Sequence, residues 1–255
     1  MRARFHINRP KVVLFGLTLA IVAAVPALAA TMGSTKSEHW GVITRNTIGS
    51  PVADLRDGPY GSFGVTGPTA QPPFGKGSLG IEVANVPGAT EKATFGNEVD
   101  FYGDPVLAIT EAGFHVFTTG ENVSYGGLRN LPNIALEIDP NLTTNPTNYT
   151  SMVWVPGPRP AASVNRWSGY IDATTDGDWY FTGSAGVTTG CNQVTFCSFT
   201  QAKAALDDGG DTPVIYTVSV GKGRDSMWIG AVDGLRLNDR VYDFEDGGVK
   251  GKGAD

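Results

Sequence analysis

Short runs in which apolar and polar residues alternate recur along this chain, and Gly, Pro, Asn or Asp bounds nearly every one. Leu79, Ile81 and Val83 are an example, because residues two apart on a strand point to the same face. Similar runs occupy residues 40–45, 106–110, 114–119, 134–139, 152–155, 167–173, 179–182, 214–220 and 228–238. Strands that are short, numerous and separated by turn residues predict an all-β fold, a two-layer antiparallel β-sandwich.

One segment has the pattern of a helix. Residues 199–208 contain Ala, Gln and Lys and stop at a Gly-Gly pair, so we expect a single short helix at one end of the sandwich. Residues 51–77 are crowded with Gly and Pro and predict one long irregular loop. No repeat or linker divides residues 40–246, which predicts one domain between a flexible spacer at 30–39 and a disordered tail at 247–255.

The first 29 residues predict an export signal. Four cationic residues precede an uncharged apolar run over residues 12–25, and Pro-Ala-Leu-Ala-Ala at 26–30 supplies the small-x-small pattern of a cleavage site. We therefore expect cleavage near Ala29 and a secreted, extracellular protein with no membrane contact after cleavage. The alternative is an uncleaved anchor, but the apolar run falls short of the roughly 20 residues that a spanning helix needs.

The charge balance narrows the choice of partners. The leader contains four of the 19 Lys and Arg residues and none of the 25 Asp and Glu residues. Its removal therefore leaves a net charge of about −10. Nucleic acid is excluded as a partner, because phosphate binding needs clustered Lys and Arg and these are scattered singly. An acidic surface provides solubility, repels anionic polymers and membranes, and is able to hold calcium.

The chain has two cysteines, Cys191 and Cys197, in a stretch rich in Thr and Asn. In an exported chain such a pair predicts one local disulfide. A metal site is the weaker interpretation, because zinc sites space their cysteines by two to four residues and need further His or Cys ligands. A single reactive thiol is weaker still, since it would oxidise with its neighbour.

The closing segment carries a family resemblance. Gly-Ala-Val-Asp-Gly-Leu-Arg-Leu at 230–237, followed by Tyr-Asp-Phe-Glu at 242–245, resembles the last strands of jelly-roll domains. These are the concanavalin A-like, laminin-G-like and galactose-binding-like sandwiches of secreted and surface proteins. Gly-Lys-Gly-Ser-Leu at 75–79 and Trp-Val-Pro at 154–156 are similar to uncharacterised exported bacterial proteins. The resemblance implies a jelly-roll-like fold and an extracellular location, and it brings no activity.

Two carboxylates share one strand face in the run Glu137-Ile138-Asp139. Glycosidases of the laminarinase type carry Glu-x-Asp-x-x-Glu on such a strand, and the pair would supply part of their catalytic machinery. The third carboxylate is missing here, because its position is Leu142 and Pro140 ends the strand first. The alternative is an ordinary edge strand with both acids in water.

Asp172, Asp176 and Asp178 place three oxygen donors within one turn, as a structural calcium ion requires. No other cofactor is suggested. Turns also recruit Asp and Gly for purely conformational reasons, so the calcium hypothesis has a plain alternative.

Four aromatic residues flank the same turn: Trp167, Tyr170, Trp179 and Tyr180. Flat aromatic faces stack on sugar rings, while nearby carboxylates bind hydroxyl groups, so these four are candidate ligand contacts. Their alternative is core packing, which is the usual place of Trp and Tyr in a sandwich.

The other motifs do not indicate catalysis. Gly-Lys-Gly-Ser-Leu-Gly at 75–80 matches the dinucleotide pattern, but a Pro-rich loop precedes it and a strand follows, where the motif needs a strand and then a helix. A serine triad needs a positioned histidine, and neither His39 nor His115 is placed for that role.

The sequence thus predicts a secreted, non-enzymatic β-sandwich that binds a glycan or another extracellular polymer. One alternative is a structural protein of the cell envelope or surface that contacts only protein. The other is a glycosidase of the laminarinase type. The binding hypothesis predicts a ligand site on the surface, and the structural hypothesis predicts no such site. The glycosidase hypothesis predicts that Glu137 is essential for activity.

Overall fold

The computed structural model describes residues 35–58, 70–86, 89–158 and 164–253, all within one compact unit that spans Met32–Asp255. The predicted leader at 1–29 and the cleavage site near Ala29 lie outside the described residues. So does the first half of the predicted spacer.

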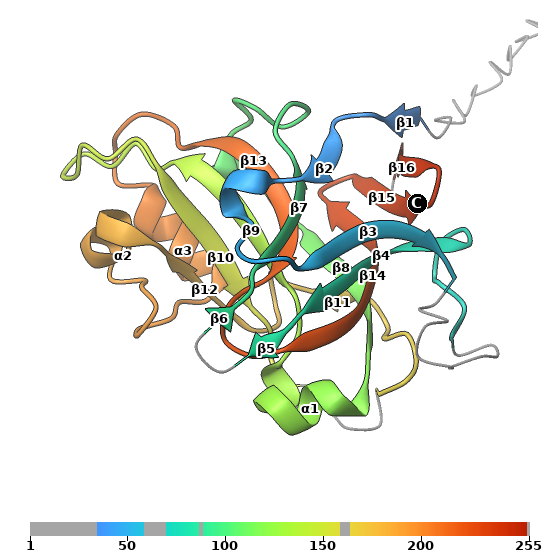
Figure 1. Cartoon of the computed structure of the whole chain (residues 1–255). Helices are drawn as coiled ribbons and strands as arrows, with labels where there is room; N and C mark the ends of the chain where they lie inside the picture. The colour runs from blue at the N-terminus through green and yellow to red at the C-terminus, as the bar shows by residue number, and fades with distance from the viewer. Residues whose placement is uncertain (1–34, 59–69, 87–88, 159–163, 254–255) are drawn as a thin grey trace, which may run out of the picture. The chain divides into compact units, whose positions relative to one another are not determined.

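One of the two main sheets has eight strands, all paired antiparallel (Figure 1). Its path runs through β1 (Thr35–Ser37), β16 (Gly248–Gly253), β15 (Arg240–Glu245), β14 (Trp228–Leu237), β4 (Gly77–Val83) and β3 (Val52–Asp57). Strand β8 (Ala112–Thr118) also pairs with β14, and β11 (Ile171–Asp172) pairs with the other edge of β8.

The second sheet has six antiparallel strands and carries the candidate site. Their order is β12 (Asp178–Phe181), β10 (Thr150–Val155), β9 (Asn133–Asp139), β13 (Val214–Lys222), β7 (Ala93–Asn97) and β2 (Trp40–Val42). A separate two-stranded hairpin joins β5 (Asn85–Val86) to β6 (Ala89–Thr90).

The core gathers side chains from both main sheets into one cluster. Leu79 and Ile81 of β4 are fully buried, as are Leu136 and Ile138 of β9, because each strand turns every second residue inward. Three indoles, those of Trp154, Trp179 and Trp228, are also fully buried. The predicted all-β sandwich is confirmed.

The predicted short helix is confirmed, but it is one of three in the described residues. The predicted helix is present as α3 (Phe199–Leu206), where the Ser198 hydroxyl accepts from the Gln201 N–H in a capping box. Two further short helices, α1 (Gly120–Gly126) and α2 (Gly183–Thr189), begin with glycine and lack a side-chain cap, so their sequences give little helical signal. In the part of the chain that the structure describes, no helix is long and apolar enough to cross a membrane.

Short 3-10 turns replace two predicted strand segments. Residues 44–46 form η1 (Thr44–Asn46) instead of continuing β2, and residues 106–108 form η4 (Val106–Ala108). A third turn, η5 (Gly127–Arg129), follows α1. In η4 the Val106 N–H donates to the Pro213 carbonyl at 2.9 Å, so this main-chain group is hydrogen-bonded without being part of a β-strand.

Three segments predicted to be irregular form strands. The described end of the spacer is β1, the predicted tail contains β16, and the predicted loop at 51–77 begins with β3. Strand β16 pairs with β15 over six residues and with β1 over three, so main-chain hydrogen bonds order a segment whose side chains carry no strand pattern.

The predicted disulfide is confirmed between Cys191 and Cys197, whose Cα atoms are 5.4 Å apart. The loop that it closes pairs with β12, because the Trp179 and Cys197 main chains exchange hydrogen bonds of 2.7 and 2.9 Å.

Replacement of both cysteines by alanine is expected to lower the free energy of unfolding by about 2 kcal/mol, since the unfolded chain then regains the entropy of a short loop. Urea unfolding under non-reducing conditions measures this. A reductant should shift the wild-type midpoint and leave the double variant unchanged; an equal shift in both would contradict the assignment.

Candidate functional site

The outward face of the six-stranded sheet is lined by polar side chains. Glu137 of β9 lies directly opposite Ser151 of β10 on one side and Thr217 of β13 on the other. Because directly opposed residues of neighbouring strands share a face, these three form one row across the middle of the sheet. The next position along β13 on this face is Ser219.

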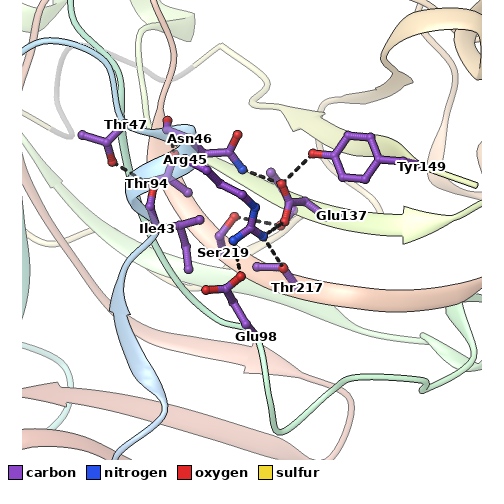
Figure 2. A network of polar contacts seen from close by, with 11 residues as sticks. Ile43, Arg45, Asn46, Thr47, Thr94, Glu98, Glu137, Tyr149, Thr217 and Ser219 are labelled. Atoms are coloured by element: carbon purple, nitrogen blue, oxygen red, sulfur yellow. Dashed lines mark hydrogen bonds and ion pairs between the residues drawn. The ribbon is translucent and has the colours of Figure 1, made fainter.

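Glu137 is the centre of a hydrogen-bond network that Figure 2 shows from close by. One oxygen, Oε1, accepts from the Asn46 amide at 2.5 Å and from the Tyr149 hydroxyl at 2.6 Å. The other, Oε2, accepts from the Arg45 guanidinium, which also donates to the Thr217 hydroxyl at 3.1 Å. Arg45 donates in addition to Glu98, so one guanidinium joins two carboxylates.

Turn η1 brings Arg45 and Asn46 over the sheet. Its position is fixed by β7, because the Ile43 N–H donates to the Thr94 carbonyl at 3.0 Å and the Thr94 hydroxyl donates to the Asn46 carbonyl at 3.1 Å. Two residues from the beginning of the domain are thereby held above a strand that lies some ninety residues later in the chain.

The network keeps Glu137 ionised. Burial opposes the charged form, but the hydrogen bonds that the carboxylate accepts outweigh burial and hold the pKa of Glu137 below its ordinary value of 4.5. Its side chain is 3% exposed, whereas that of Arg45 is 49% exposed. Glu137 therefore holds the guanidinium in place and leaves one side of it open to solvent.

The same face contains a groove of about 430 Å³ near the start of β9 and the end of β10. Its lining includes Arg129, Asn133, Tyr180, Phe196, Arg224 and Asp225. The rings of Tyr180 and Phe196 lie with their centroids 5.8 Å apart, and Phe196 is 43% exposed. An aromatic pair, with Phe196 exposed and Tyr180 half-buried, thus lies beside amide, guanidinium and carboxylate groups.

The groove and the Glu137 row belong to one surface. Asn133 precedes Glu137 by four residues on β9, which corresponds to about 13 Å along the strand. Val153 pairs with Ala135 on one side and with Tyr180 on the other, so the groove continues the outward face toward the edge strand β12.

No family model, curated protein or solved structure matches this chain. Its function has to be argued from the residues of the site, because a sandwich fold alone hosts many functions.

The structure separates the four aromatic residues that the sequence brought together as candidates. Trp179 is fully buried, and its indole N–H donates to the Ala173 carbonyl at 2.7 Å, so the ring is unable to stack on a ligand. Trp167 is partly buried against Phe117 of β8 and donates to the Ala70 carbonyl at 3.1 Å.

Tyr170 also lies away from the groove, with its ring 5.8 Å from that of His115 on β8 of the eight-stranded sheet. Of the four aromatic candidates, Tyr180 is the one that lines the groove.

The three aspartates of the predicted calcium turn have other roles. The Asp172 carboxylate accepts from the Thr174 N–H at 2.9 Å, and Asp178 forms an ion pair with Arg129 at 3.3 Å. The Asp176 carbonyl accepts from the Trp154 indole at 2.6 Å. Within the described ranges, no three His, Cys, Asp or Glu side chains are grouped so as to hold a metal ion. The turn chemistry accounts for these residues, and the calcium hypothesis gains no support.

The glycosidase hypothesis depends on a second carboxylate beside Glu137. Asp139 accepts from the Tyr216 hydroxyl at 3.0 Å, and Leu142, at the position of the missing acid, is buried.

The sequence did not indicate Arg45, Asn46 or Tyr149 as partners of Glu137, because no local spacing connects them. Phe196 was also missed, although an aromatic ring inside a polar disulfide loop is an unusual feature.

Proposed function

We propose that this protein is a secreted, non-enzymatic β-sandwich of the jelly-roll type that binds an extracellular glycan on the outward face of its six-stranded sheet. The observation that carries the proposal is the groove in which the exposed ring of Phe196 and the half-buried ring of Tyr180 adjoin polar and charged side chains. The export pattern at the N-terminus and the resemblance of the closing strands support the compartment and the fold type.

The chemistry of the groove suits a sugar ring. The C–H groups of one sugar face pack on aromatic rings, while amide, guanidinium and carboxylate groups bind the hydroxyls at the ring edge. The disulfide loop holds Phe196 in place, and the Asn192 side chain accepts from the Val194 and Thr195 N–H groups at 2.9 and 3.0 Å. An aromatic wall that is fixed before binding loses little entropy when the ligand arrives.

The lack of a third carboxylate, at the position where this chain has the buried Leu142, favours binding over hydrolysis. A glycosidase needs one carboxyl group that is protonated at working pH, and burial or a neighbouring charge must raise its pKa. The hydrogen bonds to Glu137 lower its pKa, so Glu137 is unsuited to be that acid, and its charged form suits a residue that positions Arg45. The glycosidase alternative still makes a distinct prediction, since Glu137→Gln would then abolish depolymerisation of a polysaccharide.

Phe196→Ala and Tyr180→Ala are expected to weaken glycan binding by about tenfold each, which corresponds to the loss of one stacked ring. A panel of immobilised polysaccharides identifies the ligand, and titration calorimetry compares the variants. Tyr125→Ala is the matched control, because this tyrosine is 60% exposed on α1 and does not line the groove.

Unchanged affinity of both groove variants would overturn the proposed site. If the wild-type protein binds no member of the panel and co-purifies with surface proteins, the alternative of a structural protein is correct.

A further inference from the structure

The groove carries positive charge in an acidic protein. The formal net charge of the chain is −6, yet the charged residues that line the groove are Arg129, Lys222, Arg224 and Asp225. The groove thus has three cationic residues and one anionic residue, whereas acidic residues outnumber basic ones in the whole chain. The scattered basic residues of the sequence are thus partly gathered by the fold, which sequence spacing did not indicate.

Two of the three cations are already neutralised. Lys222 is 2% exposed and its ammonium lies 2.5 Å from the Asp225 carboxylate, while Arg129 pairs with Asp178. Each of these pairs contributes little net charge to the groove.

Arg224 is the cation that remains. It is exposed in the turn between β13 and β14, and it forms no hydrogen bond or ion pair with any described residue. Lys92 lies within range of its charge: burial lowers the pKa of Lys92, the negative charge of Glu137 opposes this, and the positive charge of Arg224 adds to the lowering. Arg224 therefore has a free planar guanidinium beside an aromatic pair, and a second cation lies nearby.

We propose that the groove selects acidic glycans, in which a carboxylate or sulfate group of the sugar unit binds Arg224 while the sugar ring packs on Phe196 and Tyr180. The inference rests on the proposed function and adds the class of glycan. A guanidinium suits this role, because its parallel N–H groups match the two oxygens of a carboxylate or sulfate. The net negative charge of the rest of the protein would oppose polyanions that do not fit the groove.

The test compares polygalacturonate with its fully methyl-esterified form, and dextran sulfate with dextran. We expect the wild-type protein to bind at least one anionic member about tenfold more tightly than its neutral counterpart, with an affinity that falls as salt rises. The two pairs separate carboxylate from sulfate recognition. Arg224→Gln is expected to remove the preference, whereas Arg240→Gln, which changes an exposed arginine of β15 outside the groove, should retain it.

Equal binding of the anionic and neutral forms, or a preference that survives Arg224→Gln, would overturn this inference. The proposed function would still stand if Phe196→Ala weakened binding of the neutral polymer, and it would fail together with the inference if no polymer bound. Single-stranded DNA bound as tightly as polygalacturonate would also overturn the inference, because the groove would then attract polyanions without recognising a sugar.

Discussion

The Glu137→Ala protein is expected to have a free energy of unfolding about 3 kcal/mol below that of the wild type. The substitution removes a buried carboxylate and leaves its donors without an acceptor, among them the Asn46 amide and part of the Arg45 guanidinium. Turn η1 would lose its attachment to β9, so the outward face of the sheet would loosen with it. Urea unfolding followed by tryptophan fluorescence measures the change.

Glu98→Ala is the matched control, because Glu98 binds the same guanidinium from a half-exposed position. An exposed ion pair contributes less than about 1 kcal/mol, so this variant should remain close to the wild type. The two carboxylates share one partner and differ mainly in burial. Equal losses from the two substitutions would mean that the hydrogen bonds to Glu137 do not hold η1 in place.

The strands that the sequence predicted best are those with one buried and one polar face. In β9 the alternation of Leu136 and Ile138 with Glu137 is visible in the sequence and the strand forms there, but Glu137 is buried as well, because turn η1 binds its carboxylate. Strand β16 has no such pattern, because its order comes from main-chain pairing with β15. Strand β7 was also missed, since its sequence Ala-Thr-Phe-Gly-Asn has one large apolar residue and no clear period.

The residues of the candidate site were only partly predictable from the sequence. Tyr180 could be chosen because aromatic residues beside polar turns are common ligand contacts, and Glu137 because of its strand position. Their partners come from distant parts of the chain: Arg45 and Glu137 are separated by 92 positions. Contacts of this kind follow from the order of strands in the sheet, which local patterns do not encode. The same reason explains why Trp179, next to Tyr180, is buried: adjacent residues of a strand point to opposite faces.

Asp233 is a buried carboxylate that joins two strands of the eight-stranded sheet to the segment before β4. It is fully buried in β14, next to an irregularity in the pairing with β8. One oxygen accepts from the Phe244 N–H at 3.1 Å and the other from the Phe74 N–H at 3.0 Å. The adjacent Gly234 has φ of +61°, and a Cβ atom there would lie 2.3 Å from the Phe74 ring. Asp233 thereby fixes the segment before β4 against the β14–β15 hairpin.

Burial raises the pKa of Asp233 to about 8, against the hydrogen bonds that favour its charged form, and the negative charge of Asp243 adds to the increase. In the unfolded chain the pKa is about 3.9. Between these values the folded protein retains a proton that the unfolded chain has released. The contribution of Asp233 to the free energy of unfolding is therefore fully present below about pH 4. It decreases as pH rises toward 8, by at most about 1.4 kcal/mol per pH unit.

Asp233→Asn is expected to remove this slope. The variant should be less stable than the wild type at pH 5, by about 1 kcal/mol, because the amide nitrogen is unable to accept one of the two N–H groups. The difference should reverse by pH 8, because the wild type loses more than about 1 kcal/mol over these three pH units and the amide carries no charge to desolvate. Urea unfolding of both proteins at pH 5, 6, 7 and 8 provides the comparison. Parallel curves would show that Asp233 has the same charge in the folded and unfolded states.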